Sequence, residues 1–142
     1  MVEVNYAAIA VATIFSIVWG SLWYGPFFGK TWTKMMGWTK GDMEKGMADK
    51  AGMVKSYSIQ LVGSLIMVSV LSHSLVYAKT YLGLTGVGVG LQTGFWNWLG
   101  FVAPATLGSV LWEGKPWKLW LIYNGYFLTF LLAASVILSV WA

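Results

Sequence analysis

The sequence predicts an all-α, polytopic membrane protein with four transmembrane helices arranged as two hairpins. Of the 142 residues, 58% are hydrophobic and 10% are charged, which is more apolar than a soluble domain of this size can tolerate. The charged residues fall into short segments and leave four long apolar spans, at about residues 4–24, 56–78, 82–112 and 117–141. Each span has roughly the 20 residues that a helix needs to cross a hydrocarbon core. We therefore expect a single four-helix transmembrane domain.

The first span is expected to end before Pro26, and residues 25–55 are expected to form a cytoplasmic loop with one or two short interfacial helices. Met43 and Met47 share a helical face in this loop. Mixed charge is typical of a solvated face, although a cation site or a lipid-headgroup site is the alternative interpretation. The mixed charges here are Asp42, Glu44 and Asp49, which alternate with Lys40, Lys45 and Lys50.

Small residues at every fourth position are typical of helix contacts in membranes, because they let two backbones approach closely. One such face lies in the first span and another in the third. The predicted packing positions are Ala8, Ala12, Ser16 and Gly20 in the first span and Gly86, Gly90 and Gly94 in the third. We expect both helices to lie in tight contacts.

Asn97 lies near the middle of the third span, on the same face as the glycines and Pro104. An unpartnered carboxamide in hydrocarbon costs on the order of several kcal/mol, so Asn97 needs a partner inside the protein or a wet cavity. Pro104 removes a backbone donor and predicts a kink. Two interpretations stay open: Asn97, Gln60 and Asn124 line one polar cavity, or the three amides only clasp helices together.

The stretch LWEGKPWKLW, residues 111–120, connects the third and fourth spans. Its tryptophans are typical of a membrane interface, and its lysines suit anionic headgroups. We predict a cytoplasmic turn that works as an interface anchor, made of Trp112, Glu113, Lys115, Trp117, Lys118 and Trp120. Glu113 is expected to pair with Lys115 or with a lysine of the first loop and so to hold the two hairpins together.

The lysines predict the orientation. Eight of the nine lysines lie in residues 25–55 and 113–118, and only Lys79 lies on the opposite side. The positive-inside rule makes the lysine-rich side cytoplasmic and places both termini outside. The predicted location is the cell inner membrane, with membrane lipid as the surroundings.

Several kinds of chemistry are disfavoured by composition. The chain has no cysteine and one histidine, which excludes disulfides, thiolate metal sites and multi-histidine metal sites within one chain. The interiors of the spans hold no Asp, Glu, Lys or Arg, which argues against a charged-relay ion pump. No set of nucleophile, acid and base suggests a hydrolase. We expect no enzyme activity, no metal or other cofactor, and no nucleic-acid partner.

Four stretches carry a family resemblance. They are NYAAIAVA at residues 5–12, LWYGPFFGKTW at 22–32, GFWNWLGFVAPA at 94–105 and LWEGKPWKLWLIYNGY at 111–126. Together they resemble the bacterial four-helix membrane family known as domain of unknown function 1761. The resemblance implies a four-helix fold over nearly the whole chain, and it implies no activity and no functional residue.

The function expected from these features is that of a structural or accessory helix-bundle protein, which self-associates as a homo-oligomer or joins a larger membrane complex. The alternative is a passive small-solute channel or transporter unit with a polar cavity around Asn97. A third class is a membrane enzyme that acts on lipids with Glu113 and Lys115 at the headgroup level.

Overall fold

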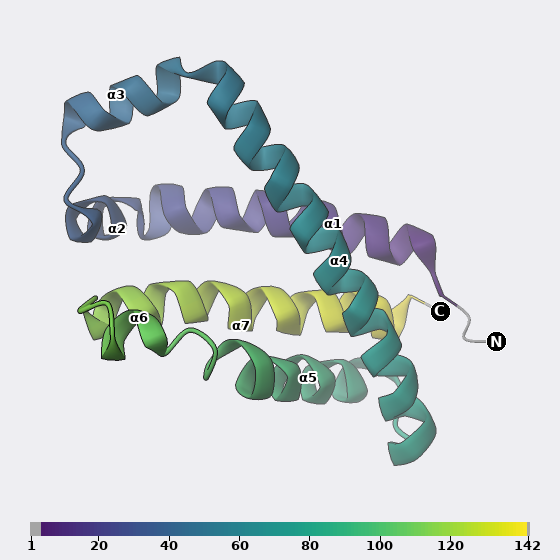
Figure 1. Ribbon diagram of the computed structural model, residues 1–142. Coiled ribbons are helices and arrows are strands. Elements are labelled where there is room, and N and C mark those ends of the chain that lie inside the picture. Colours follow the sequence, from purple (N-terminus) through teal and green to yellow (C-terminus); the bar gives the residue numbers. More distant parts are fainter. Residues whose placement is uncertain (1–3, 142) are drawn as a thin grey trace.

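Residues 4–141 of the computed structural model are described, and their regular elements are all helices (Figure 1). Seven are α-helical and two are wider π-helical turns. In chain order they are α1 (Tyr6–Leu22), η1 (Trp23–Phe27), α2 (Gly29–Met36), α3 (Lys40–Ala48), α4 (Lys50–Leu82), α5 (Gly86–Asn97), η2 (Trp98–Val102), α6 (Gly108–Leu111) and α7 (Trp117–Val140).

Three helical stretches within residues 4–141 are long and apolar enough to cross a membrane, which supports the prediction of a membrane protein. They are Tyr6–Phe27, Lys50–Leu82 and Trp117–Val140. The expected third span is not among them. Helix α4 continues to Leu82, and the chain that follows is divided into α5, η2 and α6. The segment expected as one span with a kink at Pro104 is therefore divided into separate helical pieces.

The break in this segment has a backbone cause. The amide of Ala103 donates to the carbonyl of Trp98 at 2.9 Å, a π-type bond that spans five residues. Pro104 then has no N–H to continue the ladder, and the next bonds run from the amide of Thr106 to the Val102 carbonyl at 3.1 Å and from the amide of Leu107 to the Pro104 carbonyl at 3.3 Å. The irregularity predicted at Pro104 is thus present, and residues 103–107 form a turn between η2 and α6.

The first membrane helix continues past Pro26. Pro26 lies inside η1, and the amide of Phe28 donates to the carbonyl of Trp23 at 2.9 Å. Because Pro26 has no N–H for the Leu22 carbonyl, the wider π turn carries the helix past it. The helix, expected to end before Pro26, ends at Phe27, one residue after it.

The segment predicted as a loop, residues 25–55, contains α2, α3 and the first turns of α4. One or two short helices are expected there, and two are present, α2 and α3. A capping box starts α3, in which Thr39 and Asp42 each bond the other's backbone amide. Helix α4 begins at Lys50, six residues before the expected span, and runs for 33 residues.

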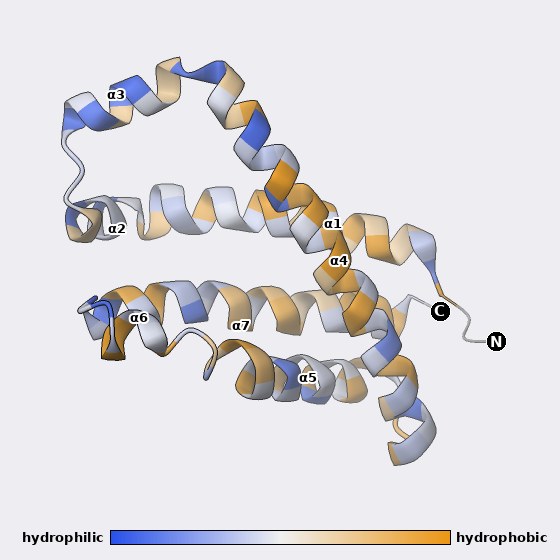
Figure 2. Ribbon diagram, viewed as in Figure 1, coloured by the Kyte–Doolittle hydropathy of each residue, from blue (hydrophilic) through white to orange (hydrophobic). Residues whose placement is uncertain are grey.

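The long helices pack around a small core (Figure 1). Helices α1 and α7 run side by side in opposite directions, and α5 and α6 lie along α7. Helix α4 crosses this layer obliquely, and α3 leads from α2 to the far end of α4. Hydrophilic residues are concentrated in α3 and the start of α4 (Figure 2). The core includes Ala8, Ala12, Val68, Val89, Phe130 and Ala134, all at most 1% exposed.

Candidate functional site

Helices α1 and α4 pack closely along only part of their lengths. The second part of α4 buries residues such as Ser64, Val68 and Leu71 against the bundle. In its first part, residues 50–62, all residues but the half-buried Gly52 are exposed. There α4 diverges from α1, and α3 spans the distance between them (Figure 1). This divergence creates two adjoining cavities, which we call the cleft.

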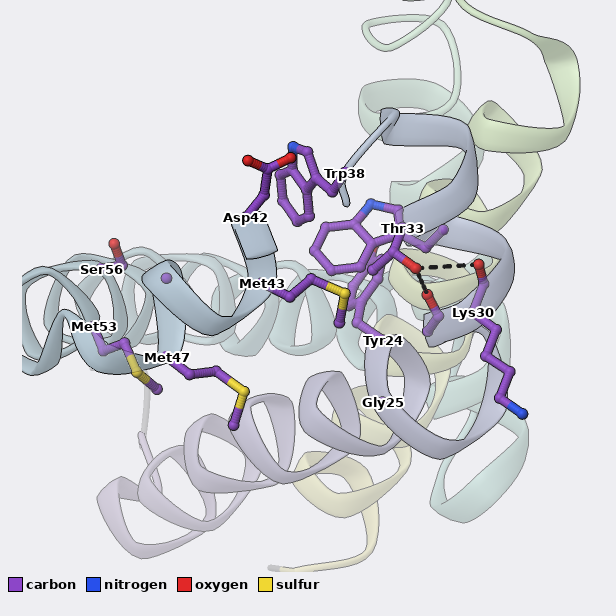
Figure 3. Close-up of a pocket in the computed structure, with 13 residues that line it drawn as sticks. Tyr24, Gly25, Lys30, Thr33, Trp38, Asp42, Met43, Met47, Met53 and Ser56 are labelled. Carbon is purple, nitrogen blue, oxygen red and sulfur yellow. Dashed lines mark hydrogen bonds between the residues drawn. The ribbon is translucent and has the colours of Figure 1, made fainter. Parts of the chain in front are cut away.

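The larger cavity has a volume of about 1050 Å³ and lies between η1, α2, α3 and the start of α4 (Figure 3). That volume is slightly above the roughly 300–1000 Å³ typical of small-molecule sites. Its lining residues are Tyr24, Gly25, Gly29, Lys30, Trp32, Thr33, Trp38, Asp42, Met43, Gly46, Met47, Met53 and Ser56.

Aromatic rings form one wall of this cavity. The rings of Tyr24 and Trp32 lie 5.0 Å apart, and those of Trp32 and Trp38 lie 5.0 Å apart at an angle of 72°. The indole N–H of Trp32 donates to the hydroxyl of Tyr123 at 3.3 Å and ties the wall to α7. Such edge-to-face packing fixes ring positions while leaving other ring faces free.

Methionines form the facing wall. Met43 and Met47 lie one turn apart on α3, and Met53 lies in the first turn of α4. Their side chains are 42%, 70% and 39% exposed, respectively, although each is apolar. Methionine is flexible and polarizable, so such a wall adapts to the shape of an apolar ligand.

Within residues 4–141, Asp42 is the only acidic residue that lines the cavity. Its carboxylate accepts a hydrogen bond from the backbone amide of Thr39 at 2.9 Å, and the Thr39 hydroxyl accepts one from the Asp42 amide at 3.1 Å. These bonds to Thr39 lower the pKa of the Asp42 carboxyl below its ordinary value of 3.8. The carboxylate is therefore ionised at neutral pH. The ammonium end of Lys30 points away from the methionines in Figure 3.

The smaller cavity, of about 440 Å³, shares Tyr24, Gly25 and Trp32 with the larger one and extends the cleft toward the core. Its lining is more polar, because hydroxyl and amide groups face it. The residues beyond the shared three are Ser16, Ile17, Gly20, Ser21, Tyr57, Gln60 and Tyr126. At its base the Tyr126 hydroxyl donates to the Ser16 carbonyl at 2.9 Å.

The three membrane amides named from the sequence lie in different surroundings. Asn97 donates to the Thr93 carbonyl of its own helix at 2.8 Å. Gln60 lines the smaller cavity and donates to Ser64 at 3.3 Å. Asn124 is 2% exposed and donates to the Thr106 hydroxyl at 2.9 Å. These hydrogen bonds do not bring the three amides together in one cavity. Asn124 alone joins two elements, because Thr106 lies in the turn after η2.

The predicted small-residue positions differ in their contacts. Ala8, Ala12 and Ser16 are buried in α1, and the Tyr126 ring lies 3.5 Å from where a Cβ on Gly20 would be. In α5 a Cβ on Gly90 or Gly94 would lie within 3 Å of the α7 backbone. Gly86 differs, since it starts α5 with a φ of +69° and has open space around it. Its glycine serves the backbone turn rather than packing.

The residues of the predicted anchor lie at the turn between α6 and α7. Trp112 is 87% exposed, and Trp117 packs edge-on against Trp120 with ring centroids 5.9 Å apart. Glu113, Lys115 and Lys118 are exposed as well. The expected ion pair between Glu113 and a lysine is not formed within residues 4–141. Pro104, the remaining predicted position, is exposed at the start of the preceding turn.

The sequence was compared with known protein families. The model of a family described as "Protein of unknown function (DUF1761)" matches residues 7–139. The chain belongs to this family. No curated protein and no solved structure matches the sequence. The family description assigns no activity, so inference about function depends on the cleft.

Sequence reasoning missed most of the cleft of this DUF1761 protein. Trp32, Trp38 and Asp42 come from different parts of residues 25–55, and nothing in their spacing places them around one space. One signal was available: Met43 and Met47 share a helical face in a segment rich in charge. An apolar stripe there indicates that something apolar faces it.

Proposed function

We propose that this protein is a non-enzymatic accessory protein of the inner membrane, and that it binds a membrane-resident amphiphile in the cleft. The observation that carries the proposal is the pairing of an apolar, aromatic cavity with a polar one inside a single cleft. A molecule with an apolar body and a polar group would satisfy both parts.

The proposed topology has four crossings in two hairpins, α1 with α4 and α5 with α7. Its third crossing is the broken segment α5–η2–α6, which lies along α7 and runs in the opposite direction. Three contacts support this register: Gly90 lies against Ser135, Gly94 against Leu131, and Thr106 against Asn124. A break inside a crossing is tolerated where neighbouring protein satisfies the freed backbone groups.

The cleft then lies toward the cytoplasmic leaflet. The lysines of α2, α3 and the α6–α7 turn mark the cytoplasmic side in this topology, and both termini lie outside. At about 1.5 Å per residue, α4 is near 50 Å long, whereas a hydrocarbon core is about 30 Å thick. Its first turns, which line the larger cavity, would project into the interface. Such a position lets an amphiphile enter sideways from the bilayer.

Acyl chains alone would be poor occupants of the inner part of the cleft. Tyr57 and Gln60 are exposed there, and the carboxamide of Gln60 has a partner at 3.3 Å only in its own helix. Polar groups that face hydrocarbon cost free energy unless a partner pairs with them. A solute path, the alternative function, would also pass through this cleft rather than around Asn97.

Photolabelling tests the proposed binding. The full-length protein is reconstituted in phosphatidylcholine vesicles that contain a neutral diacylglycerol with a photoreactive diazirine chain, and the adducts are mapped by mass spectrometry. Adducts are expected at Met43 and Met47. The variant Ser56→Trp places a bulky ring in the larger cavity and is expected to reduce those adducts at least fivefold.

Ser58→Trp is the matched control, because Ser58 is exposed on α4 but does not line either cavity. It should leave the adducts at Met43 and Met47 unchanged. Labelling at Ile66, which is 59% exposed outside the cleft, reports ordinary lipid contact and should be the same in all variants. Equal labelling at Met43 in both tryptophan variants would refute the proposed site.

Self-association is a second proposed property, and Gln92 favours it. Gln92 is exposed on α5, whereas Gly90, Thr93 and Gly94 on that helix are buried. In the proposed topology this amide faces lipid. A carboxamide has both a donor and an acceptor, so two copies related by a two-fold axis can pair through the same residue. A subunit of a larger complex could use the same face.

Gln92→Leu tests this surface. The variant is expected to shift a dimer to monomer in dodecyl maltoside, measured by sedimentation velocity. Gln60→Leu is the matched control, because Gln60 faces the cleft, and it should leave the sedimentation coefficient unchanged. A parent protein that is monomeric at every concentration tested in both detergent and lipid nanodiscs would refute self-association.

A further inference from the structure

We propose that the larger cavity of the cleft selects lipophilic cations, with Asp42 supplying the negative charge and Trp32 and Trp38 supplying the aromatic surface. This inference rests on the proposed function and specifies its ligand: an apolar molecule with a permanent or protonated cationic centre, such as an alkylammonium or a phosphonium.

The first support is the position of Asp42. Trp38 precedes Thr39 directly, and the capping box draws the Asp42 carboxylate back to the Thr39 amide. The carboxylate therefore lies beside the indole that lines the same cavity (Figure 3). The hydrogen bond from Thr39 is to one oxygen of the carboxylate, which leaves the other oxygen available to a ligand.

The second support is the aromatic wall. A cation over the face of a tryptophan is attracted by the ring quadrupole, and tryptophan is the most effective of the aromatic residues. Trp32 and Trp38 meet at 72°, so their faces are turned in different directions and form a corner. Tyr24 extends this corner at 5.0 Å from Trp32. A corner of rings beside a carboxylate is a favourable place for an ammonium or phosphonium centre.

The third support is the chemistry of the remaining wall. Met43, Met47 and Met53 offer apolar, polarizable contacts to the body of the ligand. The hydroxyl of Thr33 is already engaged, because it donates to the carbonyls of Gly29 and Lys30. Among the described residues that line the cavity, Lys30 is the only cation that could meet an anionic head, and in Figure 3 its ammonium points away from the methionines. The cavity thus matches a lipophilic cation better than a lipophilic anion.

A matched pair of probes tests the selectivity. Tetraphenylphosphonium and tetraphenylborate have nearly the same size and opposite charge. Their binding to the full-length protein in dodecyl maltoside is measured by isothermal titration calorimetry, with empty micelles as the blank. The parent protein is expected to bind the phosphonium at least tenfold more tightly than the borate.

Two variants locate the binding. Asp42→Asn is expected to weaken phosphonium binding about fivefold, because it removes the charge that attracts the cation. Glu44→Gln makes the same change of charge two residues away without lining the cavity, and it should change binding less than twofold. Asp42→Glu keeps both the charge and the capping box and should retain binding, which separates a charge effect from a loss of α3.

A second pair of variants tests the contribution of the aromatic rings to phosphonium binding. Trp38→Leu is expected to weaken phosphonium binding about two- to fivefold. Trp112→Leu removes an exposed tryptophan outside the cleft and should have no effect. Because Trp38→Leu leaves the Thr39–Asp42 cap intact, this variant tests the cavity even if Asp42→Asn loosens α3.

The outcomes separate the two proposals. Equal binding of the two probes, or phosphonium binding that neither Asp42→Asn nor Trp38→Leu changes, would overturn cation selectivity. If the neutral photoprobe still labels Met43 and Met47 in that case, the proposed amphiphile site stands without its charge preference. Absence of both labelling and phosphonium binding would overturn both proposals.

Discussion

The α5–α7 pair and the α1–α4 pair differ in how closely their backbones approach. A Cβ on Gly94 would lie 2.7 Å from the Leu131 carbonyl oxygen, so α5 and α7 have no space between them. Helices α1 and α4 pack together around residues such as Ala12 and Val68, but residues 50–62 of α4 diverge from α1. One pair forms the scaffold, and the other opens a cleft.

The two helix pairs differ because different kinds of residues lie where their helices meet. Glycines spaced by four let α5 and α7 pack along their lengths. On α4, the bulky Tyr57 and the polar Gln60 take the place of small residues, and α3 holds the start of the helix at a distance from α1. The same kind of helix pair is therefore closely packed in one half and open at one end in the other.

The largest expected effect is at the tight pair. Gly94→Ala is expected to lower the free energy of unfolding by about 1–3 kcal/mol, because the new methyl group would overlap the α7 backbone, which cannot yield as a side chain can. Thermal unfolding in detergent, followed by circular dichroism, measures the change. Gly88→Ala, on the same helix with nothing within 4 Å of the new methyl, is the control and should not destabilise.

A smaller effect is expected at the contact that ties α7 to the broken segment. Asn124→Leu removes the hydrogen bond to Thr106 and is expected to cost about 1–2 kcal/mol. A double-mutant cycle with Thr106→Val should give a coupling energy of about 0.6 kcal/mol, the average for such bonds between membrane helices. Strictly additive effects would show that the pair contributes nothing to the fold.

Substitutions in the part of α4 that diverges from α1 are expected to have little effect on stability. Tyr57→Leu changes a residue that is 49% exposed and is expected to alter the free energy of unfolding by no more than about 0.5 kcal/mol. Thermal unfolding under the conditions used for Gly94→Ala measures it. A loss as large as that of Gly94→Ala would mean that residues 50–62 are part of the folding core and would end the distinction between the two pairs.

The smallest effect concerns pH. The pKa of Asp42 is lowered in the folded protein by its bonds to Thr39. Its contribution to stability is therefore fully present above the ordinary carboxyl pKa of 3.8 and is lost as pH falls through the lowered value. The protection factors of the first amides of α3, which compare their hydrogen exchange with the intrinsic rate at the same pH, should fall below pH 3.8. Asp42→Asn should remove this dependence. An unchanged pH profile in Asp42→Asn would assign it to another group.

Sequence reasoning reached the helical class, the membrane character and the small helices of residues 25–55, because these depend on local composition and periodicity. It located the irregularity at Pro104 but not its extent, since a π turn over Trp98–Val102 and a turn over residues 103–107 separate α5 from α6. It also failed at Gly86, where a position in a glycine stripe serves a left-handed backbone turn instead of a contact. Spacing alone does not distinguish these two uses of glycine.

The sequence by itself determined that this chain is helical, is apolar enough for the membrane and belongs to a family of unknown function, since these properties are written in residue type and order. Only the tertiary structure decided that Trp38, Asp42 and Met47 surround one cavity. Their meeting depends on the direction in which α3 leaves α2 and on the angle between α4 and α1. Those directions are set by packing between distant segments, and no local pattern encodes them.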